Sequence, residues 1–292
     1  MINMKALSFA PGHVSGFFEP IYWQYDASRS GSRGSGINLS LGAVSETTVK
    51  SSNKQNIEVY INKKLSKAPV TKLAVKQLIG NSPLNIIINT ELHLPVGQGF
   101  GMSGAGALSA TTAIAKLLKI PKEQAIKTSH FAEVQLHTGL GDVIASSFGG
   151  IEIRREAGLP PWGVIEHIPG KYEVVLCVVG KKIDTKKILS DYDSINEIAS
   201  YGRYCTNKLL EKPSLENLFS LSQMFTVKTG LADKKVLEAI ESANHHGMAS
   251  MCMLGNSLFA IGDTNMLYET LSSFGKTYVC CVADYGVCIL EK

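Results

Sequence analysis

The stretch "LPVGQGFGMSGAGALSATTAIAKLL", Leu94 to Leu118, joins a cluster of glycines to an alanine-rich pattern. Five glycines lie between Gly97 and Gly106, and the residues that follow have the composition of a helix. Glycine costs conformational entropy wherever a regular element could form, so its concentration here needs a physical cause. The stretch therefore predicts positive φ angles, or a close approach of the backbone to another group, directly before a helix.

Three known nucleotide-binding loops can be compared with this stretch. Gly99, Gly101 and Gly104 match the spacing GxGxxG, but a dinucleotide fold also needs an acidic residue about twenty positions later, after a second strand. The segment in that place, "LKIPKEQAIKTSHF", reads as the start of a helix. A Walker loop fails because no GK[ST] follows the glycines, and a protein-kinase loop fails because HRD and DFG motifs are absent.

A glycine-rich turn before a helix N-terminus nevertheless has a clear chemical use. It presents several backbone N–H groups and the positive end of the helix dipole, a combination that binds phosphate. The residues expected to hold the phosphates of a nucleotide are Gly97, Gly99, Gly101, Met102, Ser103 and Gly104. The Ser103 hydroxyl stands at the mouth of the helix, where it could cap the helix or bind Mg²⁺. A tight turn that only packs two domains together is the structural alternative.

Length, composition and charge describe an ordinary globular chain. The 292 residues are enough for one large or two ordinary domains, and 45% of them are hydrophobic while 18% are charged. The net charge of +4 comes from scattered lysines, which argues against nucleic-acid binding. No apolar run is long enough to cross a membrane, and the six cysteines form no CxxC pair. These features predict a cytoplasmic protein with free thiols, no nucleic-acid partner and no membrane association.

The order of the remaining patterns predicts two α+β domains. Strands are expected at "ALSFAPGH", which should break at Pro11–Gly12, at "NIEVYINK" and at "LNIIINTELHLP", with helices over 104–118 and 121–138. The segment "SRSGSRGSG" is expected to be a mobile loop because it consists of serine, glycine and arginine. After residue 160 the alternation of strands and helices starts again. We therefore expect domains over residues 1–160 and 161–292.

Four segments of the chain are similar, in order, to the motifs of the GHMP kinase superfamily. "PVGQGFGMSGAGALS" resembles the second motif, PxxxGLGSSAA, with Pro95, Gly99, Gly101 and Ser103 in register. "FAPGHVSGFFEP" is similar to the first motif, APGRVNLIGEH, and "TGLGDVIASSFGG" to the segment SGxDNxxSxxGG. "SMCMLGNSLFAIGD" stands where the third motif, a glycine-rich turn between strands, is expected. "APGHVSGFF" and "RGSGINLSLG" look most like the archaeal pantoate kinase branch of this superfamily.

The resemblance implies a two-domain α+β fold, with an N-terminal ATP-binding α/β domain and a C-terminal ferredoxin-like α+β domain. It implies that ATP and Mg²⁺ are the cofactors, and that the primary hydroxyl of (R)-pantoate is phosphorylated to 4-phosphopantoate on the route to coenzyme A. A kinase for another small acid, of the mevalonate, homoserine or shikimate type, is the alternative in the same class. A nucleotide-binding sensor without activity is the alternative in a different class, and assembly as a homodimer is left open.

Two acidic residues receive roles from the resemblance. Asp142, within "TGLGDVIASS", falls on the catalytic aspartate that accepts the proton of the substrate hydroxyl. In a loose phosphoryl-transfer transition state, such a group orients the hydroxyl at least as much as it deprotonates it. Glu133 falls on the glutamate that binds Mg²⁺ together with Ser103, since Mg²⁺ prefers oxygen ligands. By themselves the residues leave two alternatives: Asp142 as a helix N-cap, and Glu133 in an exposed pair with His137 four positions later.

The substrate residues are expected at the first motif and in the serine- and glycine-rich segment. His13 stands where many superfamily members have lysine or arginine, and it is expected to contact the substrate or to end a strand. Pantoate has a carboxylate, and a planar guanidinium binds carboxylates through two hydrogen bonds. Arg33 is therefore the expected clamp, ahead of Arg29, with Ser15 and Ser35 as hydroxyl partners. No motif locates the surface that stacks on adenine.

Overall fold

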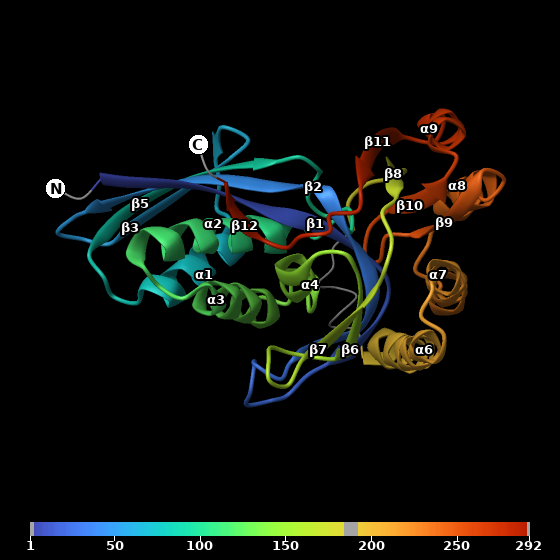
Figure 1. Ribbon diagram of the computed structural model, residues 1–292, viewed down its shortest axis with the longest axis horizontal. Coiled ribbons are helices and arrows are strands. Elements are labelled where there is room, and N and C mark those ends of the chain that lie inside the picture. The colour runs from blue at the N-terminus through green and yellow to red at the C-terminus, as the bar shows by residue number, and fades with distance from the viewer. Residues whose placement is uncertain (1–2, 184–191, 291–292) are drawn as a thin grey trace.

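The computed structural model describes residues 3–183 and 192–290, which form two β-sheets with helices packed against them (Figure 1). The larger sheet has the strand order β12-β1-β2-β5-β3-β4, and β6 and β7 extend it beside β2. The smaller sheet has the order β11-β8-β10-β9. Every strand pair in the two sheets is antiparallel except β3 with β5, which is parallel. This mixture is the α+β architecture that the sequence predicts.

The larger sheet takes most of its strands from the first half of the chain. Its strands are β1 (Asn3–Ile21), β2 (Gly31–Ser51), β3 (Asn56–Ile61), β4 (Lys64–Leu65), β5 (Leu84–Leu92), β6 (Ile151–Glu156), β7 (Val164–Ile168) and β12 (Cys288–Leu290). The helices of this part are α1 (Pro69–Ile79), α2 (Met102–Leu118), α3 (Lys122–Gln135) and α4 (Asp142–Phe148). The helices expected over 104–118 and 121–138 correspond to α2 and α3, and α3 ends three residues earlier than expected.

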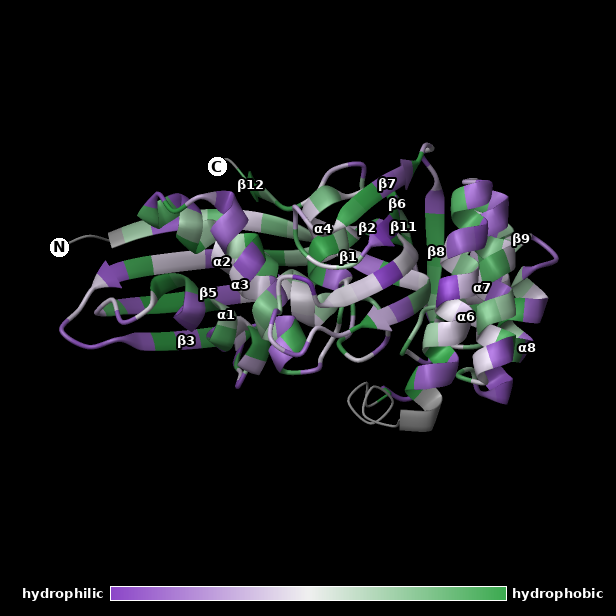
Figure 2. Cartoon of the chain, turned by 90° about the horizontal axis from the view of Figure 1, so that it is seen from below, coloured by the Kyte–Doolittle hydropathy of each residue, from purple (hydrophilic) through white to green (hydrophobic). Residues whose placement is uncertain are grey.

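The smaller sheet lies with its helices at the other end of the molecule (Figure 2). Its strands are β8 (Glu173–Val178), β9 (Gly247–Met251), β10 (Ser257–Gly262) and β11 (Lys276–Cys281). Its helices are α6 (Tyr192–Glu211), α7 (Leu215–Thr229), α8 (Lys234–Ala243) and α9 (Thr264–Ser272). Side-chain caps fix the starts of three of these helices, because Ser214, Asp233 and Asp263 each accept a hydrogen bond from a backbone N–H in the first turn.

The long hairpin of β1 and β2 carries the larger sheet into a strong bend. The register between the two strands shifts at Pro11–Gly12 and again between Ser15 and Phe17, and such bulges increase the local bend and twist. The expected end of the strand at Pro11–Gly12 is therefore wrong, because the proline is accommodated by a bulge and the pairing continues beyond it. Beyond the bend, β2 leaves β5 and pairs with β6.

The serine- and glycine-rich segment is a strand from Gly31 onward, so the expected mobile loop over residues 28–36 is wrong there. A Cβ atom at Gly34 would lie 2.4 Å from the Phe17 carbonyl oxygen. A Cβ atom at Gly36 would lie 2.2 Å from the Val14 carbonyl oxygen and 2.5 Å from His13 Nε2. These glycines therefore make space within a packed sheet and do not mark a flexible connection.

Helix α2 forms the centre of the first part of the chain. Its residues from Gly104 to Ala115 are all buried, and their small side chains let α1 and α3 pack closely on one side and β1 and β2 on the other. A single cluster of buried apolar side chains continues from this region into the smaller sheet. The rings of Phe17 and Phe18 on β1 pack against Phe225 of α7 and link the two parts.

The larger sheet also receives strands from beyond residue 160. Strand β7 pairs with β6, and β12 returns to pair with β1 near the N-terminus. The division into domains over 1–160 and 161–292 stays a prediction. None of the described helices is long and apolar enough to cross a membrane.

Candidate active site

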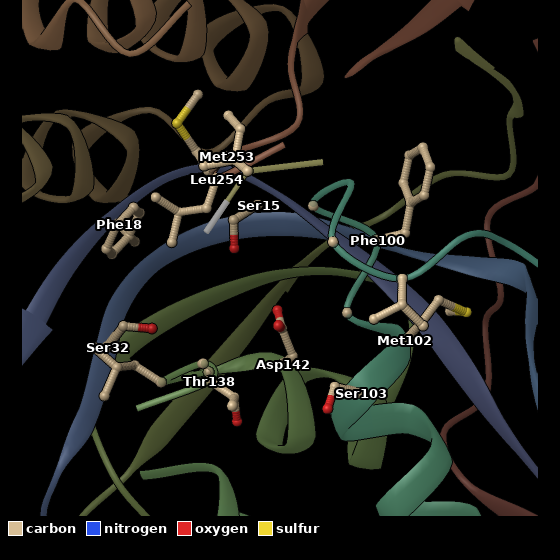
Figure 3. A pocket seen from close by; sticks show the side chains of 18 of the residues that line it. Ser15, Phe18, Ser32, Phe100, Met102, Ser103, Thr138, Asp142, Met253 and Leu254 are labelled. Carbon is tan, nitrogen blue, oxygen red and sulfur yellow. The ribbon is translucent and has the colours of Figure 1, made fainter. Parts of the chain in front are cut away.

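A cavity of about 550 Å³ opens where the glycine-rich loop meets β1, the residues before α4 and the β9–β10 turn (Figure 3). Seven of the predicted site residues line it, namely Ser15, Gly97, Gly99, Gly101, Met102, Ser103 and Asp142. The other lining residues are Phe18, Ser32, Val96, Phe100, Thr138, Gly139, Leu140, Gly141, Lys182, Ile183, Met253 and Leu254. The cavity thus collects polar groups from segments that are far apart in the sequence.

The glycines of the loop each make room for a different neighbour. Gly97, Gly99 and Gly101 all have positive φ angles, of 79°, 72° and 63°. A Cβ atom at Gly97 would lie 3.0 Å from Cβ of Lys182, and one at Gly99 would lie 2.8 Å from the Met253 carbonyl oxygen. A Cβ atom at Gly101 would lie 3.3 Å from Asp142. Both causes considered from the sequence, positive φ and close backbone approach, therefore act together.

The loop ends at the N-terminus of α2, which has no side-chain cap. Gly101 is the N-cap residue, and the first turn contains no acidic residue. The backbone N–H groups at the start of a helix lack partners within the helix, so they can donate to an anion. Ser103 is the second residue of α2 and lines the cavity, so its expected role as a cap is not observed. This end of the cavity suits phosphate.

Asp142 projects from the first position of α4 into the cavity. Its side chain is 28% exposed, and Figure 3 shows it facing Ser15 across the open space. The N-cap of α4 is Gly141 without a side-chain bond, so Asp142 does not act as the cap. The Asp142 carboxylate instead accepts a hydrogen bond at Oδ1 from His13 Nδ1, over 2.8 Å. Its free edge is therefore available to an alcohol placed in the cavity.

His13 lies behind Asp142 and is completely buried. Its second ring nitrogen, Nε2, is 2.9 Å from Oε1 of Glu152, which is also buried. Burial alone lowers the pKa of His13, but the negative charge of Glu152 and the hydrogen bonds with both carboxylates outweigh it and raise the pKa to about 9. His13 is therefore a cation at neutral pH. It does not line the cavity, so it contacts Asp142 and not the cavity contents.

Glu133 lies under the first turn of α2, close to Asp142. A Cβ atom at Gly104 would lie 3.0 Å from Glu133 Oε1, and one at Gly139 would lie 2.4 Å from the same oxygen and 3.2 Å from Asp142 Oδ2. Burial, followed by the charge of Asp142, raises the pKa of Glu133 well above its usual range. The exposed pair with His137 is not formed, because Glu133 is buried and His137 lies beyond the end of α3.

Besides His13, three predicted substrate residues lie outside the cavity. Arg33 donates to Glu19 over 2.9 Å and to Asn207 over 3.0 Å, so its guanidinium is occupied in an ion pair between β1 and β2. Ser35 donates to the Glu152 carbonyl oxygen over 2.6 Å and is buried. Arg29 stacks on the ring of Trp23. Their roles as substrate contacts stay predictions.

Arg154 on β6 was not selected from the sequence, although it borders the cavity wall. It is 2% exposed and donates through Nη2 to Ser15 Oγ over 3.1 Å and through Nη1 to Glu152. Its Nε has no hydrogen-bond partner among the described residues, and a Cβ atom at Gly141 would lie 2.9 Å from it. The run "IEIRRE" alternates isoleucines with charged residues, which predicts Glu152 and Arg154 on the solvent face of a strand, whereas the structure buries both faces from Ile151 to Arg154.

Lys182 was also not selected from the sequence. It follows β8, and it is the one cationic side chain among the described residues that line the cavity. Its aliphatic stem lies on Gly97, and the next residue, Ile183, donates its N–H to the Gly97 carbonyl oxygen over 3.2 Å. Gln98 holds the same segment by donating to the Gly180 carbonyl oxygen over 3.0 Å. These bonds fix the backbone of Lys182 beside the loop.

The β9–β10 turn forms the cavity wall directly beside the loop. Met253 and Leu254 line the cavity, and Met253 donates its N–H to the Ser15 carbonyl oxygen over 3.0 Å. A Cβ atom at Gly255 would lie 2.1 Å from the carbonyl carbon of Gln98, so this position requires glycine. The turn predicted as the third motif therefore packs directly on the glycine-rich loop.

A second cavity of about 310 Å³ adjoins the first and shares Val96, Met102 and Ser103 with it. Its other lining residues come from β3, the start of α1, β5 and α2, and they are Ile61, Ser66, Lys67, Ala68, Pro69, Val70, Thr71, Thr90, Leu92 and Gly106. The wall is largely apolar, and it lies beside the N-terminus of α2. It therefore suits a flat apolar group connected to the anion that the loop binds.

Residues 57–150, which contain the loop and Asp142, match the model of the GHMP kinases N terminal domain. A pantoate kinase of Methanocaldococcus jannaschii is 36% identical over 274 residues, which cover 93% of this chain and 98% of the relative. The chain belongs to the GHMP kinase family. A second relative of this GHMP kinase, a pantoate kinase of Thermococcus kodakarensis, is 31% identical over 88% of each chain.

Two solved structures have the same fold. A "phosphotransferase related to CoA biosynthesis pathway" is 28% identical, with a TM-score of 0.89 over 98% of this chain and 99% of that one. A homoserine kinase from Cytophaga hutchinsonii is 15% identical, with a TM-score of 0.70 over 98% and 97%. These likenesses confirm the two-part α+β fold predicted from the motifs. The family match and the pantoate kinase relatives show that the protein is an ATP-dependent kinase.

Proposed function

We propose that this kinase transfers the γ-phosphoryl group of ATP to the primary hydroxyl of (R)-pantoate and releases 4-phosphopantoate and ADP. The observation that carries the proposal is one cavity in which Asp142 faces the uncapped N-terminus of α2 and the glycine-rich loop. Full-length relatives named pantoate kinase, at 31–36% identity, support this acid over mevalonate or homoserine. Three solved structures of mevalonate and homoserine kinases are 13–15% identical, a likeness that shows the fold alone.

The triphosphate would lie on the loop, with its oxygens accepting hydrogen bonds from the backbone N–H groups of Met102, Ser103 and Gly104. The aliphatic stem of Lys182 lies on Gly97, and its ammonium group would add a positive charge at the same end of the cavity. The second cavity, which opens beside Ser103, would hold the adenine ring. Each part of ATP then meets a surface of matching chemistry.

Ser103 and Glu133 would hold Mg²⁺, and the residues fit that ion. Mg²⁺ binds through one or two protein oxygens and takes its other ligands from phosphates and water. The buried Glu133 carboxyl resists ionisation next to Asp142, and a divalent cation beside it would offset that cost. When bound, Mg²⁺ neutralises part of the charge on the phosphates.

Asp142 would accept the proton of the pantoate hydroxyl while the hydroxyl oxygen forms its bond to the γ-phosphorus and the bond to ADP breaks. Its Oδ1 is held by His13, so the other oxygen is the one directed at the hydroxyl. The acid's carboxylate would lie between Ser15 and Ser32 at the cavity wall that Arg154 supports. Arg154 is better placed than Arg33 for this task, because its Nε is free and Arg33 is already paired.

The experiment is a measurement of ADP release with pantoate, mevalonate, homoserine and shikimate as acceptors, followed by identification of the phosphorylated product. We expect turnover with pantoate alone. The Asp142→Asn variant, which keeps the size of the side chain but removes its charge, should lose roughly two to four orders of magnitude in turnover and still bind ATP. If another acid is turned over and pantoate is not, that acid is the substrate. If the protein binds nucleotide but turns over no acid, the alternative of a sensor without activity is favoured.

A further inference from the structure

Four charged side chains form a hydrogen-bonded chain at the cavity, and three of them, His13, Glu152 and Arg154, are buried behind it. Asp142 is bonded to His13, His13 to Glu152, and Glu152 to Arg154, which in turn donates to Ser15. The charges alternate in sign along this chain, and only its two ends, Asp142 and Ser15, line the cavity. Glu152 is the central member, and it contacts neither the cavity nor any residue predicted to touch ATP.

A glycine on strand β2, Gly36, makes room for the contact between His13 and Glu152. His13 is on β1 and Glu152 is on β6, and β2 runs between them with Gly36 paired to Glu152. A Cβ atom at Gly36 would lie 2.5 Å from His13 Nε2, so any side chain there would block the ring from reaching Glu152. The glycine thus allows a bond across the middle strand between residues 139 positions apart.

The bonds of His13 define its protonation state. A neutral imidazole has one N–H donor, but the His13 ring faces a carboxylate at each nitrogen, Asp142 from α4 and Glu152 from β6. Only the imidazolium can donate to both. Nη1 of Arg154, also on β6, lies 3.3 Å from His13 Nε2, and its positive charge opposes the protonation of His13. The negative charge of the more distant Glu133, on α3, favours that protonation. Glu152 is the anion that lies between the two cations and offsets their repulsion.

We propose that Glu152 is a positioning residue for the phosphoryl transfer: it keeps His13 doubly protonated, and His13 in turn fixes the orientation and the negative charge of the Asp142 carboxylate. This inference rests on the proposed function only for its kinetic consequence. Without the imidazolium, Asp142 would face the nearby Glu133 carboxyl with no cation beside it. The Asp142 carboxylate would then be held less firmly in the orientation and the charge state in which it accepts the proton of the alcohol.

The first test follows His13 directly, by NMR titration of histidine labelled with ¹⁵N, with His13 assigned through its absence in a His13→Gln variant. In the wild type we expect two protonated ring nitrogens until about pH 9. In Glu152→Gln, whose amide has the same shape without the charge, the titration should move down by at least about one pH unit. A wild-type His13 that is neutral at pH 7.5 would overturn the inference without any variant.

The second test is the pH profile of pantoate phosphorylation. Glu152→Gln should bring the alkaline loss of kcat to lower pH by the same interval, so that kcat at pH 8.5 falls about threefold, while KM for ATP stays unchanged. Glu152→Asp, which retains the charge, should restore the position of the alkaline limb. Glu156→Gln, on the exposed end of the same strand, is the matched control and should behave as wild type.

The outcomes separate the two proposals. If Glu152→Gln keeps the wild-type His13 titration and the wild-type alkaline limb, Glu152 has no positioning role. If Glu152→Gln does not fold, the wild-type titration and the Glu152→Asp profile still decide. If the wild type phosphorylates no pantoate, the proposed function fails, and the NMR titration continues to test Glu152.

Discussion

Arg154 is buried with an N–H group that has no acceptor among the described residues. Arg154 does not itself line the cavity, but its Nε lies against Gly141, which does. Because buried polar groups are almost always hydrogen-bonded, we expect a ligand in the cavity to complete the bonding of this guanidinium. Arg33 is a useful contrast, because three of its nitrogens donate to protein oxygens, at Glu19, Asn207 and Arg155. We therefore expect Arg154, and not Arg33, to bind the carboxylate of the acid.

We predict that Arg154→Lys raises KM for pantoate about tenfold or more and leaves KM for ATP unchanged, because an ammonium cannot reproduce the bonds of a planar fork. Steady-state kinetics with each substrate varied in turn measures both constants. Arg33→Ala serves as the comparison and should change KM for pantoate less than about threefold. A rise of thirtyfold in Arg33→Ala, with Arg154→Lys unaffected, would return the carboxylate clamp to Arg33.

At the scale of elements, the glycine-rich loop joins three otherwise separate segments. It contacts Lys182 after β8, the β9–β10 turn and the start of α4, each through a different glycine. A left-handed backbone angle costs an ordinary residue roughly 1–2 kcal/mol before any clash is counted. Changes in the loop should therefore affect nucleotide binding and the packing of the smaller sheet together.

We predict that Gly99→Ala weakens ATP binding about tenfold or more and lowers the free energy of unfolding, because φ is 72° and the added Cβ would lie 2.8 Å from the Met253 carbonyl oxygen. Calorimetric titration with ATP and chemical denaturation measure the two effects. Gly106→Ala, in the interior of α2, is the comparison for stability alone, because Gly106 lines the second cavity, where adenine is proposed to bind. Its Cβ would meet only ordinary contacts at 3.8 Å, so it should raise the free energy of unfolding by about 0.5–1 kcal/mol.

The elements that sequence predicts best are those whose signal is local. The loop, α2 and α3 are set by residues adjacent in the chain and lie where they are expected, apart from the last three residues of α3, and Asp142 lines the cavity, although its catalytic role stays a prediction. The start of β2 is different, because serine and glycine usually mark loops, and here they give His13 a path to Glu152. Arg154 and Glu152 could not be selected because their partners, Ser15 and His13, lie 139 positions away.

At the scale of the whole molecule, one buried imidazolium links stability to pH. The pKa of His13 is about 9 in the folded protein and 6.5 for an ordinary histidine, so the folded state binds the proton more tightly. The stabilisation is therefore fully present below pH 6.5 and is lost as pH rises through about 9. The difference amounts to roughly 3 kcal/mol, because one pKa unit is about 1.4 kcal/mol.

We predict that the free energy of unfolding, measured in urea, falls between pH 6 and pH 9.5 by an amount of this order. The buried Glu133, whose pKa is also raised, acts in the same direction, so the wild type alone does not isolate His13. His13→Gln supplies the comparison, and its decrease over the same range should be smaller by about 2–3 kcal/mol. Equal decreases in the two proteins would show that His13 is not charged in the folded state.

Strand β12 pairs with Leu7, Ser8 and Phe9 of β1, although almost the whole described chain separates them. On the ribosome, β1 is made long before β12. Until β12 arrives, this part of β1 presents unpaired backbone groups, and such an open edge can recruit a strand from another chain. A chain that still lacks β12 can therefore aggregate through the unpaired edge of β1, and β12 protects that edge once the two strands have paired.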